Sequence, residues 1–406
     1  MADLHTAEDF NKKRTELEQD LKERGDDLPP ANILVAGITG TGKSTLLNAI
    51  FGKNFAETGT GRPVTEHMSE YHSDDIPIRI WDTVGLELDS EKTRKSIGDI
   101  RAQIAEMAEH RNPYDKVHAI WYCINSNSKR YQGAELEFIK ELHSLGVPFI
   151  IVMTQCSGDE DEVNAFQKEI ERINSSMGLN DVSVVQVLAQ PFKFRNMSEP
   201  IEPFGLEELV SLTCNKLPEF IMKGFVAAQK VSQREKRAAS ESVIYDYAEQ
   251  ATKGFWDKVP IVNVFTTDDK IKRMFCNLGK MYNTLLDPEE IDKIIYGSDI
   301  DFHNNFWGLI APFDVVGYSD KITALFERKK DAGFAVEAAK IEKRERAARM
   351  IAFYGYTFID SIEELWETST EEQLKNIQVT VDRLIDIINK KLRERKTKTS
   401  ANTKKK

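Results

Sequence analysis

The segment Gly37–Ser44 constrains the fold of this 406-residue chain more than any other part of the sequence. It reads Gly-Ile-Thr-Gly-Thr-Gly-Lys-Ser, fits the pattern GxxxxGK[ST] and follows the apolar run Ile33–Ala36. Glycines let the backbone wrap a phosphate with its N–H groups pointing inward, and the N-terminus of the next helix adds a positive dipole. Between a predicted strand and the predicted helix Ser44–Phe51, the pattern predicts a phosphate-binding loop.

Two side chains of this loop carry the predicted chemistry. Lys43 is expected to place its ammonium group on the β- and γ-phosphate oxygens, and the Ser44 hydroxyl is expected to ligate Mg²⁺. The remaining residues of the loop that we expect to bind the nucleotide are Gly37, Thr39, Gly40, Thr41, Gly42 and Thr45.

Two further segments complete the predicted phosphate and metal site. Asp82-Thr-Val-Gly85 stands at the end of the strand run Ile76–Trp81, where the carboxylate of Asp82 can hold a Mg²⁺ water and the Gly85 N–H can meet a γ-phosphate. Thr65, in a glycine-rich segment, can complete the Mg²⁺ shell when a γ-phosphate is present, although a surface threonine is the alternative. Thr58 and Thr60 are weaker candidates for that role.

Apolar runs alternate with amphipathic stretches between residues 31 and 217. This alternation predicts an α/β domain with a mostly parallel sheet covered by helices on both faces. Residues 218–392 lack strand runs and predict an all-α domain. The helices expected there are Ala227–Lys253, Asp268–Leu286, Lys321–Phe358 and Thr370–Leu392. Residues 1–30 are predicted to form a helical arm, and residues 393–406 a disordered basic tail.

Composition narrows the class of protein. The net charge of −11 excludes a molecule that is cationic as a whole, as a nucleic-acid binder would be. The four cysteines show no disulfide framework and no CxxC pair, and the polar N-terminus shows no secretory signal. We therefore expect a cytoplasmic protein, with peripheral contact to a membrane, or contact to RNA through the basic tail, as weaker alternatives.

With its phosphate loop, Thr65 and DxxG in this order, the segment from Asn32 to Leu217 resembles the translation-factor-like P-loop GTPases, near the Era-like and ribosome-assembly G domains. The C-terminal region resembles a helical domain of unknown function found behind some G domains. The resemblance implies GTP and GDP as ligands, Mg²⁺ as cofactor, and a protein partner, with a GTP-dependent homodimer as one form.

The base-reading element departs from the [NT]KxD of the resembled family. Thr154 fits, Gln155 stands in place of the lysine, and Ser157 stands in place of the aspartate that accepts both guanine N–H groups. A serine hydroxyl is no bidentate charged acceptor, so the choice between guanine and adenine is left open. Asp159 or Asp161 could replace it, but a solvated acidic loop is the favoured interpretation.

A second base-reading element follows the last strand run. Leu188-Ala189-Gln190 resembles the family's SAK element, whose alanine N–H donates to guanine O6, so Ala189 and Gln190 favour GTP over ATP.

Hydrolysis is predicted to be slow. Leu86 follows the DxxG motif where Ras-like members carry a glutamine that orients water, and leucine cannot polarise water. Arg62 is a weak candidate for a charge-stabilising residue, and an exposed loop arginine is the favoured interpretation. The sequence thus predicts a slow Mg²⁺-dependent GTPase whose helical domain relays the nucleotide state. The alternatives are a nucleotide-dependent assembly protein with negligible hydrolysis, and an ATP-using switch.

Overall fold

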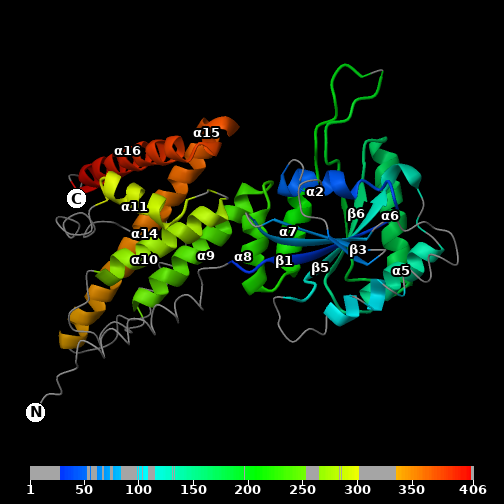
Figure 1. The fold of residues 1–406 in the computed structure, drawn as a ribbon, viewed down its shortest axis with the longest axis horizontal. Coiled ribbons are helices and arrows are strands. Elements are labelled where there is room, and N and C mark those ends of the chain that lie inside the picture. The colour runs from blue at the N-terminus through cyan, green and yellow to red at the C-terminus, as the bar shows by residue number, and fades with distance from the viewer. Residues whose placement is uncertain are drawn as a thin grey trace, which may run out of the picture. The chain divides into compact units, whose positions relative to one another are not determined.

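The computed structural model divides into two compact units, Asp27–Glu235 and a second one that contains Lys236–Lys406 (Figure 1). The structure describes residues 28–52, 55, 62–65, 68–73, 76–83, 98, 100–102, 104–107, 115–129, 131, 133–195, 197–252, 265–282, 284, 286–300 and 335–403. Of the predicted N-terminal arm, only residues 28–30 are among them.

The first unit is built on a seven-stranded sheet in the order β2-β3-β4-β1-β5-β6-β7, counted over the described residues. Its strands are β1 Ala31–Ala36, β2 Arg62–Thr65, β3 Met68–Ser73, β4 Ile76–Thr83, β5 Ala119–Asn125, β6 Phe149–Thr154 and β7 Ser183–Gln186. Strands β4, β1, β5, β6 and β7 pair in parallel, and β2 and β3 pair antiparallel at one edge. This confirms the predicted α/β fold with a mostly parallel sheet.

Helices cover both faces of this sheet. Their bounds are α2 Lys43–Phe51, α5 Ala134–His143, α6 Glu160–Ser176, α7 Leu206–Lys216 and α8 Glu219–Ala228. Successive residues of β5 serve the two faces: Tyr122 packs against Phe138 of α5, whereas Trp121 packs against Phe51 of α2 and Phe225 of α8. This is why the central strands are apolar throughout rather than alternating.

The second unit is helical in its described residues, as predicted. Its helices are α9 Gln233–Thr252, of which the first three residues belong to the first unit, α10 Phe265–Met281, α11 Pro288–Gly297, α14 Ala335–Thr368, α15 Glu371–Lys375 and α16 Ile377–Thr403. An ion-pair network ties α9 to α14, because Arg237 pairs with both Asp360 and Glu363. Helix α16 continues past residue 393, where the sequence places the start of a disordered tail.

Several elements differ from those that the sequence predicts. The polar hairpin of β2 and β3 lacks an apolar run, and α7, α8 and α11 were not predicted as separate helices. The predicted helix Ala227–Lys253 is interrupted between α8 and α9, where the Gln229 side chain bonds the backbone of Val231 and Ser232. Side-chain bonds of this kind compete with a helix.

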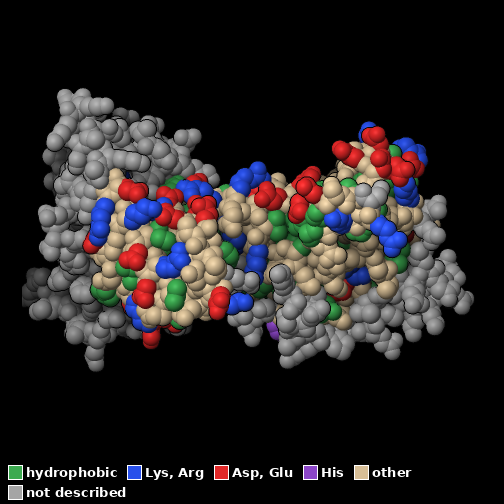
Figure 2. Space-filling view, turned by 90° about the horizontal axis from the view of Figure 1, so that it is seen from above, with side chains coloured by type: hydrophobic (Ala, Val, Ile, Leu, Met, Phe, Trp, Pro, Cys, Tyr) green, Lys and Arg blue, Asp and Glu red, His purple; other side chains and the backbone are tan. Residues whose placement is uncertain are grey.

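The described surface carries charges of both signs and one small apolar projection. On the face shown in Figure 2, acidic and basic side chains are interspersed. Antiparallel bridges Leu188↔Phe204 and Phe192↔Ile201 form a projection after β7, and it contains four of the exposed large hydrophobic residues, Phe192, Phe194, Met197 and Phe204. No described helix is both long and apolar enough to cross a membrane.

Candidate nucleotide-binding site

The loop between β1 and α2 has the backbone that the glycine spacing predicts. Gly37, Gly40 and Gly42 have φ angles of 144°, 82° and 83°, a region that side chains disfavour. At Gly37 space is also lacking, because a Cβ atom would lie 2.5 Å from the carbonyl oxygen of Cys123 on β5. The loop therefore depends on glycine for both its conformation and its close approach to the sheet.

The side chain of Lys43 is folded back into this loop. Its Nζ donates to the Gly37 carbonyl at 2.9 Å, and the residue is only 8% exposed. The Thr41 hydroxyl donates to the Ile38 carbonyl at 2.8 Å and closes the loop from the other side. The ammonium group thus lies against the carbonyls of Gly37 and Ile38 inside the loop, where its charge can meet a phosphate.

The helix that follows presents its N-terminus to the same place. Gly42 caps α2 without a side-chain hydrogen bond, so no side chain competes for the first N–H groups. Ser44 is exposed in the first turn, Thr45 is half-buried beside it, and Thr39 is exposed at the tip of the loop.

Asp82 lies near the end of β4, the strand next to β1, and close to the loop. Its strand β4 pairs with β1, with Val35 opposite Asp82, and its Oδ1 lies 4.0 Å from Lys43 Nζ. That oxygen is buried and has no hydrogen-bond partner. Burial raises the pKa of Asp82 from 3.8 to about 6, and the charge of Lys43 opposes the rise.

These residues fit a Mg²⁺ ion that is held together with phosphate. The unpartnered oxygen of Asp82 and the exposed hydroxyl of Ser44 are the hard oxygen donors that Mg²⁺ prefers. The described residues contain no group of three or more His, Cys, Asp or Glu that would form a complete protein cage. Mg²⁺ commonly takes one or two protein oxygens and completes its shell with phosphate and water.

The remaining predicted residues of the phosphate and metal site are only partly described. Thr65 ends β2, where it pairs with Met68 of β3, and Met68 in turn pairs with Thr83 of β4. Thr65 therefore belongs to a strand rather than to the predicted loop. Gly85, Leu86, Thr58 and Thr60 lie outside the described residues, and Arg62 begins β2.

The loop after β6 contacts the phosphate loop directly. The Thr154 hydroxyl donates to the Thr41 carbonyl, and the Gln155 side-chain amide donates to the Gly40 carbonyl at 3.0 Å. Gln155 has a left-handed φ of 55°, which turns its side chain over Gly42. The side chain of Gln155 thus lies over the phosphate loop.

Two asparagines that the sequence analysis missed support this glutamine. Asn125 Nδ2 donates to Gln155 Oε1 at 3.3 Å, and Asn127 Nδ2 donates to the Gln155 carbonyl at 3.2 Å. Asn125 ends β5 and starts the short 3-10 turn Ser126–Ser128. In the sequence, Asn125 could have been identified as an amide side chain at the end of a buried strand, because ligands bind at the carboxyl edge of such a sheet.

Ser157 and Asp159, which follow β6, both have hydrogen bonds within this segment. Ser157 is 3% exposed, and its N–H and hydroxyl both lie toward the Gln155 carbonyl, at 2.7 and 3.5 Å. The Asp159 carboxylate caps α6 by accepting from Asp161 N–H and Glu162 N–H. After β7, Ala189 is half-buried and Gln190 is exposed.

Residues 32–155 match the family model described as 50S ribosome-binding GTPase. The first unit is a G domain. It has the P-loop GTPase fold of the translation-factor and ribosome-assembly type, as the sequence analysis expected. The match and the geometry of the phosphate loop carry this assignment.

Two curated proteins of Saccharomyces cerevisiae are similar to part of the chain. Cell division control protein 11 is 27% identical over 172 residues, which cover 35% of this chain and 41% of that protein. Cell division control protein 10 is 26% identical over 171 residues, which cover 35% and 53%. The chain thus spans about half the length of these relatives or less.

Solved structures give only low similarity. The probable GTP-binding protein EngB has a TM-score of 0.32 at 18% identity, covering 47% of this chain and 98% of that one. Era of Aquifex aeolicus has a TM-score of 0.31 at 16% identity, covering 55% and 68%. Scores this low add nothing to the assignment of the G domain.

We expect the stability of the nucleotide-free G domain to fall as Asp82 ionises. Because burial raises its pKa from 3.8 to about 6, the native state binds this proton more tightly than the unfolded chain does. The resulting contribution, about 2 to 3 kcal/mol, is complete below the unfolded pKa and is lost as the pH rises through the native one.

Urea unfolding across this pH range, for the natural chain and for Asp82→Asn, measures the contribution. The variant should lack this part of the pH dependence, and identical slopes for the two proteins would contradict the assignment to Asp82.

Proposed function

We propose that the G domain is a Mg²⁺-dependent guanine-nucleotide switch and a slow GTPase that converts GTP to GDP and phosphate. The observation that carries this proposal is the arrangement around Lys43. A buried ammonium group lies inside a glycine loop, 4.0 Å from a carboxylate oxygen that has no hydrogen-bond partner. The ammonium group can bind phosphate oxygens, and the carboxylate oxygen can hold the metal or one of its waters.

Each residue has a distinct role in this proposal. Lys43 binds the β- and γ-phosphate oxygens, while Ser44 and Asp82 hold the metal and its water. When bound, Mg²⁺ neutralises charge on the phosphates. Thr65 senses the γ-phosphate from the end of β2, and Gly85 donates its N–H to it.

The base is proposed to lie against the loops after β6 and β7. Both loops sit at the carboxyl edge of the sheet, and Gln155 bonds the phosphate loop there. In the loop after β6 the carboxylate of Asp159 caps α6. Ala189 favours guanine through its N–H, so GTP is the preferred ligand but with weaker discrimination than a carboxylate would give.

A calorimetric titration with GTP and with ATP, each with and without Mg²⁺, tests this function. We expect GTP to bind more tightly than ATP and both to weaken without Mg²⁺. If neither triphosphate binds at millimolar concentration, the proposal fails. If ATP binds as well as GTP, the site is that of an ATP-using switch.

Replacing Ser157 with aspartate should sharpen the choice of base. A carboxylate at this position could accept two hydrogen bonds from guanine N1–H and N2–H, which adenine does not offer. Charge-assisted bonds of this kind contribute about 1.5 to 3 kcal/mol, so the preference for GTP over ATP should rise about tenfold or more.

The matched control is Ser157→Ala, which should leave the preference unchanged because the natural hydroxyl lies toward the Gln155 carbonyl. A loss of GTP preference in the alanine variant would instead show that the hydroxyl reads the base. Unfolding measurements on both variants separate specificity from a loss of the fold.

The proposal extends to the rate of hydrolysis and to the helical unit. Leu86 cannot orient water, so we propose that a partner or a second copy completes the site, and that the helical unit relays the nucleotide state. The second candidate function is a GTP-dependent assembly protein with negligible hydrolysis, which the same leucine supports. Single-turnover phosphate release and light scattering, measured together, distinguish the two. Contact with a membrane or RNA stays a prediction.

A further inference from the structure

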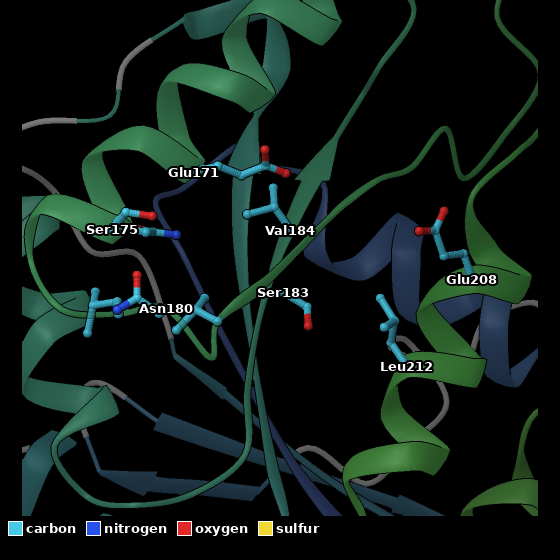
Figure 3. Close-up of a pocket in the computed structure, with 10 residues that line it drawn as sticks. Glu171, Ser175, Asn180, Ser183, Val184, Glu208 and Leu212 are labelled. Atoms are coloured by element: carbon cyan, nitrogen blue, oxygen red, sulfur yellow. The ribbon is translucent and has the colours of Figure 1, made fainter.

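A groove of about 350 Å³ lies beside β7, at the opposite end of the sheet from the phosphate loop (Figure 3). Helix α6 borders it through Glu171 and Asn174, and helix α7 borders it through Glu208 and Leu212. Ser183 and Val184, at the amino end of β7, lie between the two helices. The phosphate loop, in contrast, follows the carboxyl end of β1, so this groove is a separate feature of the G domain.

The strand that borders the groove is the edge of the sheet. Within the described sheet β7 pairs with β6 alone. The Val187 N–H donates to the Met153 carbonyl of β6. Because the backbone groups of successive strand residues point to opposite sides, those of Val184, three residues earlier, point away from β6. There the Gln167 side-chain amide lies 3.5 Å from the Val184 carbonyl, a long contact that an incoming main-chain N–H could replace. Exposed edges of this kind accept an additional strand.

The lining combines apolar side chains with carboxylates on both sides of the strand. Figure 3 shows Glu171 on α6 and Glu208 on α7, with Val184 on β7 beside Glu171 and Leu212 on α7 below Glu208. Both carboxylates belong to exposed residues, so they can reach a cation without an uncompensated cost of burial. The stem of a lysine or arginine can cover the apolar floor while its charged end meets a carboxylate.

One residue of the groove wall contains a buried donor without a hydrogen-bond partner. Asn174 is 2% exposed, and its Oδ1 accepts a hydrogen bond from the Tyr131 hydroxyl. Its Nδ2 is buried and has no hydrogen-bond partner, although the residue lines the groove. A buried amide donor left unpaired costs about 1 to 3 kcal/mol, which a carbonyl oxygen of a bound peptide would recover.

We propose that this groove binds an extended basic segment of a partner protein, which adds to β7 as a further strand. Its main chain would pair with Val184 and offer a carbonyl to Asn174, and its lysine or arginine side chains would meet Glu171 and Glu208. The lining is complementary to a basic ligand, since both of its charged residues, Glu171 and Glu208, are acidic.

The same carboxylates argue against a second copy of this chain as the occupant. In a two-fold pairing of β7 with its own copy, the acidic walls would face one another. Like charges opposite each other across a strand pair destabilise it. The groove therefore discriminates between a basic segment and self-association.

The test uses the full-length protein and a fluorescein-labelled seven-residue probe in which valine and arginine alternate. A matched probe carries glutamate in place of arginine. We expect the arginine probe to bind at least about tenfold more tightly than the glutamate probe, because the charged groups meet at a partly desolvated surface. Equal binding of the two probes, or no binding of either, would overturn the proposal.

The protein variants test the site itself. Changing both Glu171 and Glu208 to Gln should weaken binding of the arginine probe about five- to tenfold. The control changes Glu199 and Glu202, two exposed acids outside the groove, to Gln and removes the same charge. An equal loss in the control would show non-specific attraction and refute the site. Lys43→Ala should bind the probe normally, since the groove is independent of the proposed nucleotide site.

Strand addition is tested by blocking main-chain hydrogen bonds. Val184→Pro removes the outward N–H of β7, which an edge strand tolerates, and should weaken the probe about tenfold. An arginine probe with N-methyl groups at every second residue asks the same question with the protein unchanged. Because successive N–H groups of a strand point to opposite edges, the register that blocks the outer edge should bind like the parent probe, and the other register should lose binding. If both registers bind as tightly as the parent probe, the ligand is not held as a strand.

Discussion

Replacement of Lys43 by alanine is expected to lower the affinity of the G domain for GTP by about 100- to 1,000-fold and to abolish phosphate release. The ammonium group already lies inside the phosphate loop, bonded to the Gly37 carbonyl, and is 8% exposed. Two charge-assisted bonds to phosphate oxygens at about 1.5 to 3 kcal/mol each account for a loss of this size. No other lysine among the described residues lies in the loop to replace it.

Titration calorimetry and single-turnover phosphate release measure the two parts of this result. Lys140→Ala, which removes an exposed lysine of α5, is the matched control and should change neither. Because Lys43 also opposes the raised pKa of Asp82, its removal leaves a buried carboxylate without its cation. Adding Asp82→Asn to Lys43→Ala should restore the lost stability but not the affinity for GTP. If Lys43→Ala still binds GTP at the natural affinity, the proposed role of Lys43 is wrong.

The sequence predicts those parts of the G domain in which local pattern and fold agree. The loop Gly37–Ser44 required a strand before it and a helix after it, and the structure contains both. The strand run Ile76–Trp81 likewise brings Asp82 to within 4.0 Å of Lys43 through the pairing of β4 with β1. Such contacts follow from the parallel sheet itself, because neighbouring strands end at the same edge.

Features that depend on tertiary contacts were not accessible from the sequence. The strand Met68–Ser73 is polar and is held by its pairing with β2 and β4, so no apolar periodicity marks it. Helix α11 has no counterpart among the predicted helices, although Asp287 caps it and Pro288 occupies its first turn. The contact of Asn125 with Gln155 joins residues 30 positions apart and follows only from the packing of β5 against β6.

Substitution of Gly205 by alanine is expected to destabilise the G domain by about 3 to 5 kcal/mol. Gly205 precedes α7 with a φ of 77°, and a Cβ atom there would lie 1.8 Å from the Gln186 carbonyl oxygen and 2.9 Å from its carbon. Both close atoms belong to the backbone of β7, which cannot move aside as a flexible side chain could. Either β7 shifts away from β6 or α7 starts elsewhere, and each change opens the packed interior.

A glycine with a similar φ angle but free space separates the two causes. Gly146 has a φ of 69°, and a Cβ atom there would meet nothing within 4 Å. Gly146→Ala should therefore cost only about 1 kcal/mol, the strain of a left-handed alanine. Urea unfolding of both variants gives the difference, which measures the steric contact with β7 alone. Equal losses would mean that the backbone angle, and not the close approach of Gly205 to Gln186, fixes glycine at this position.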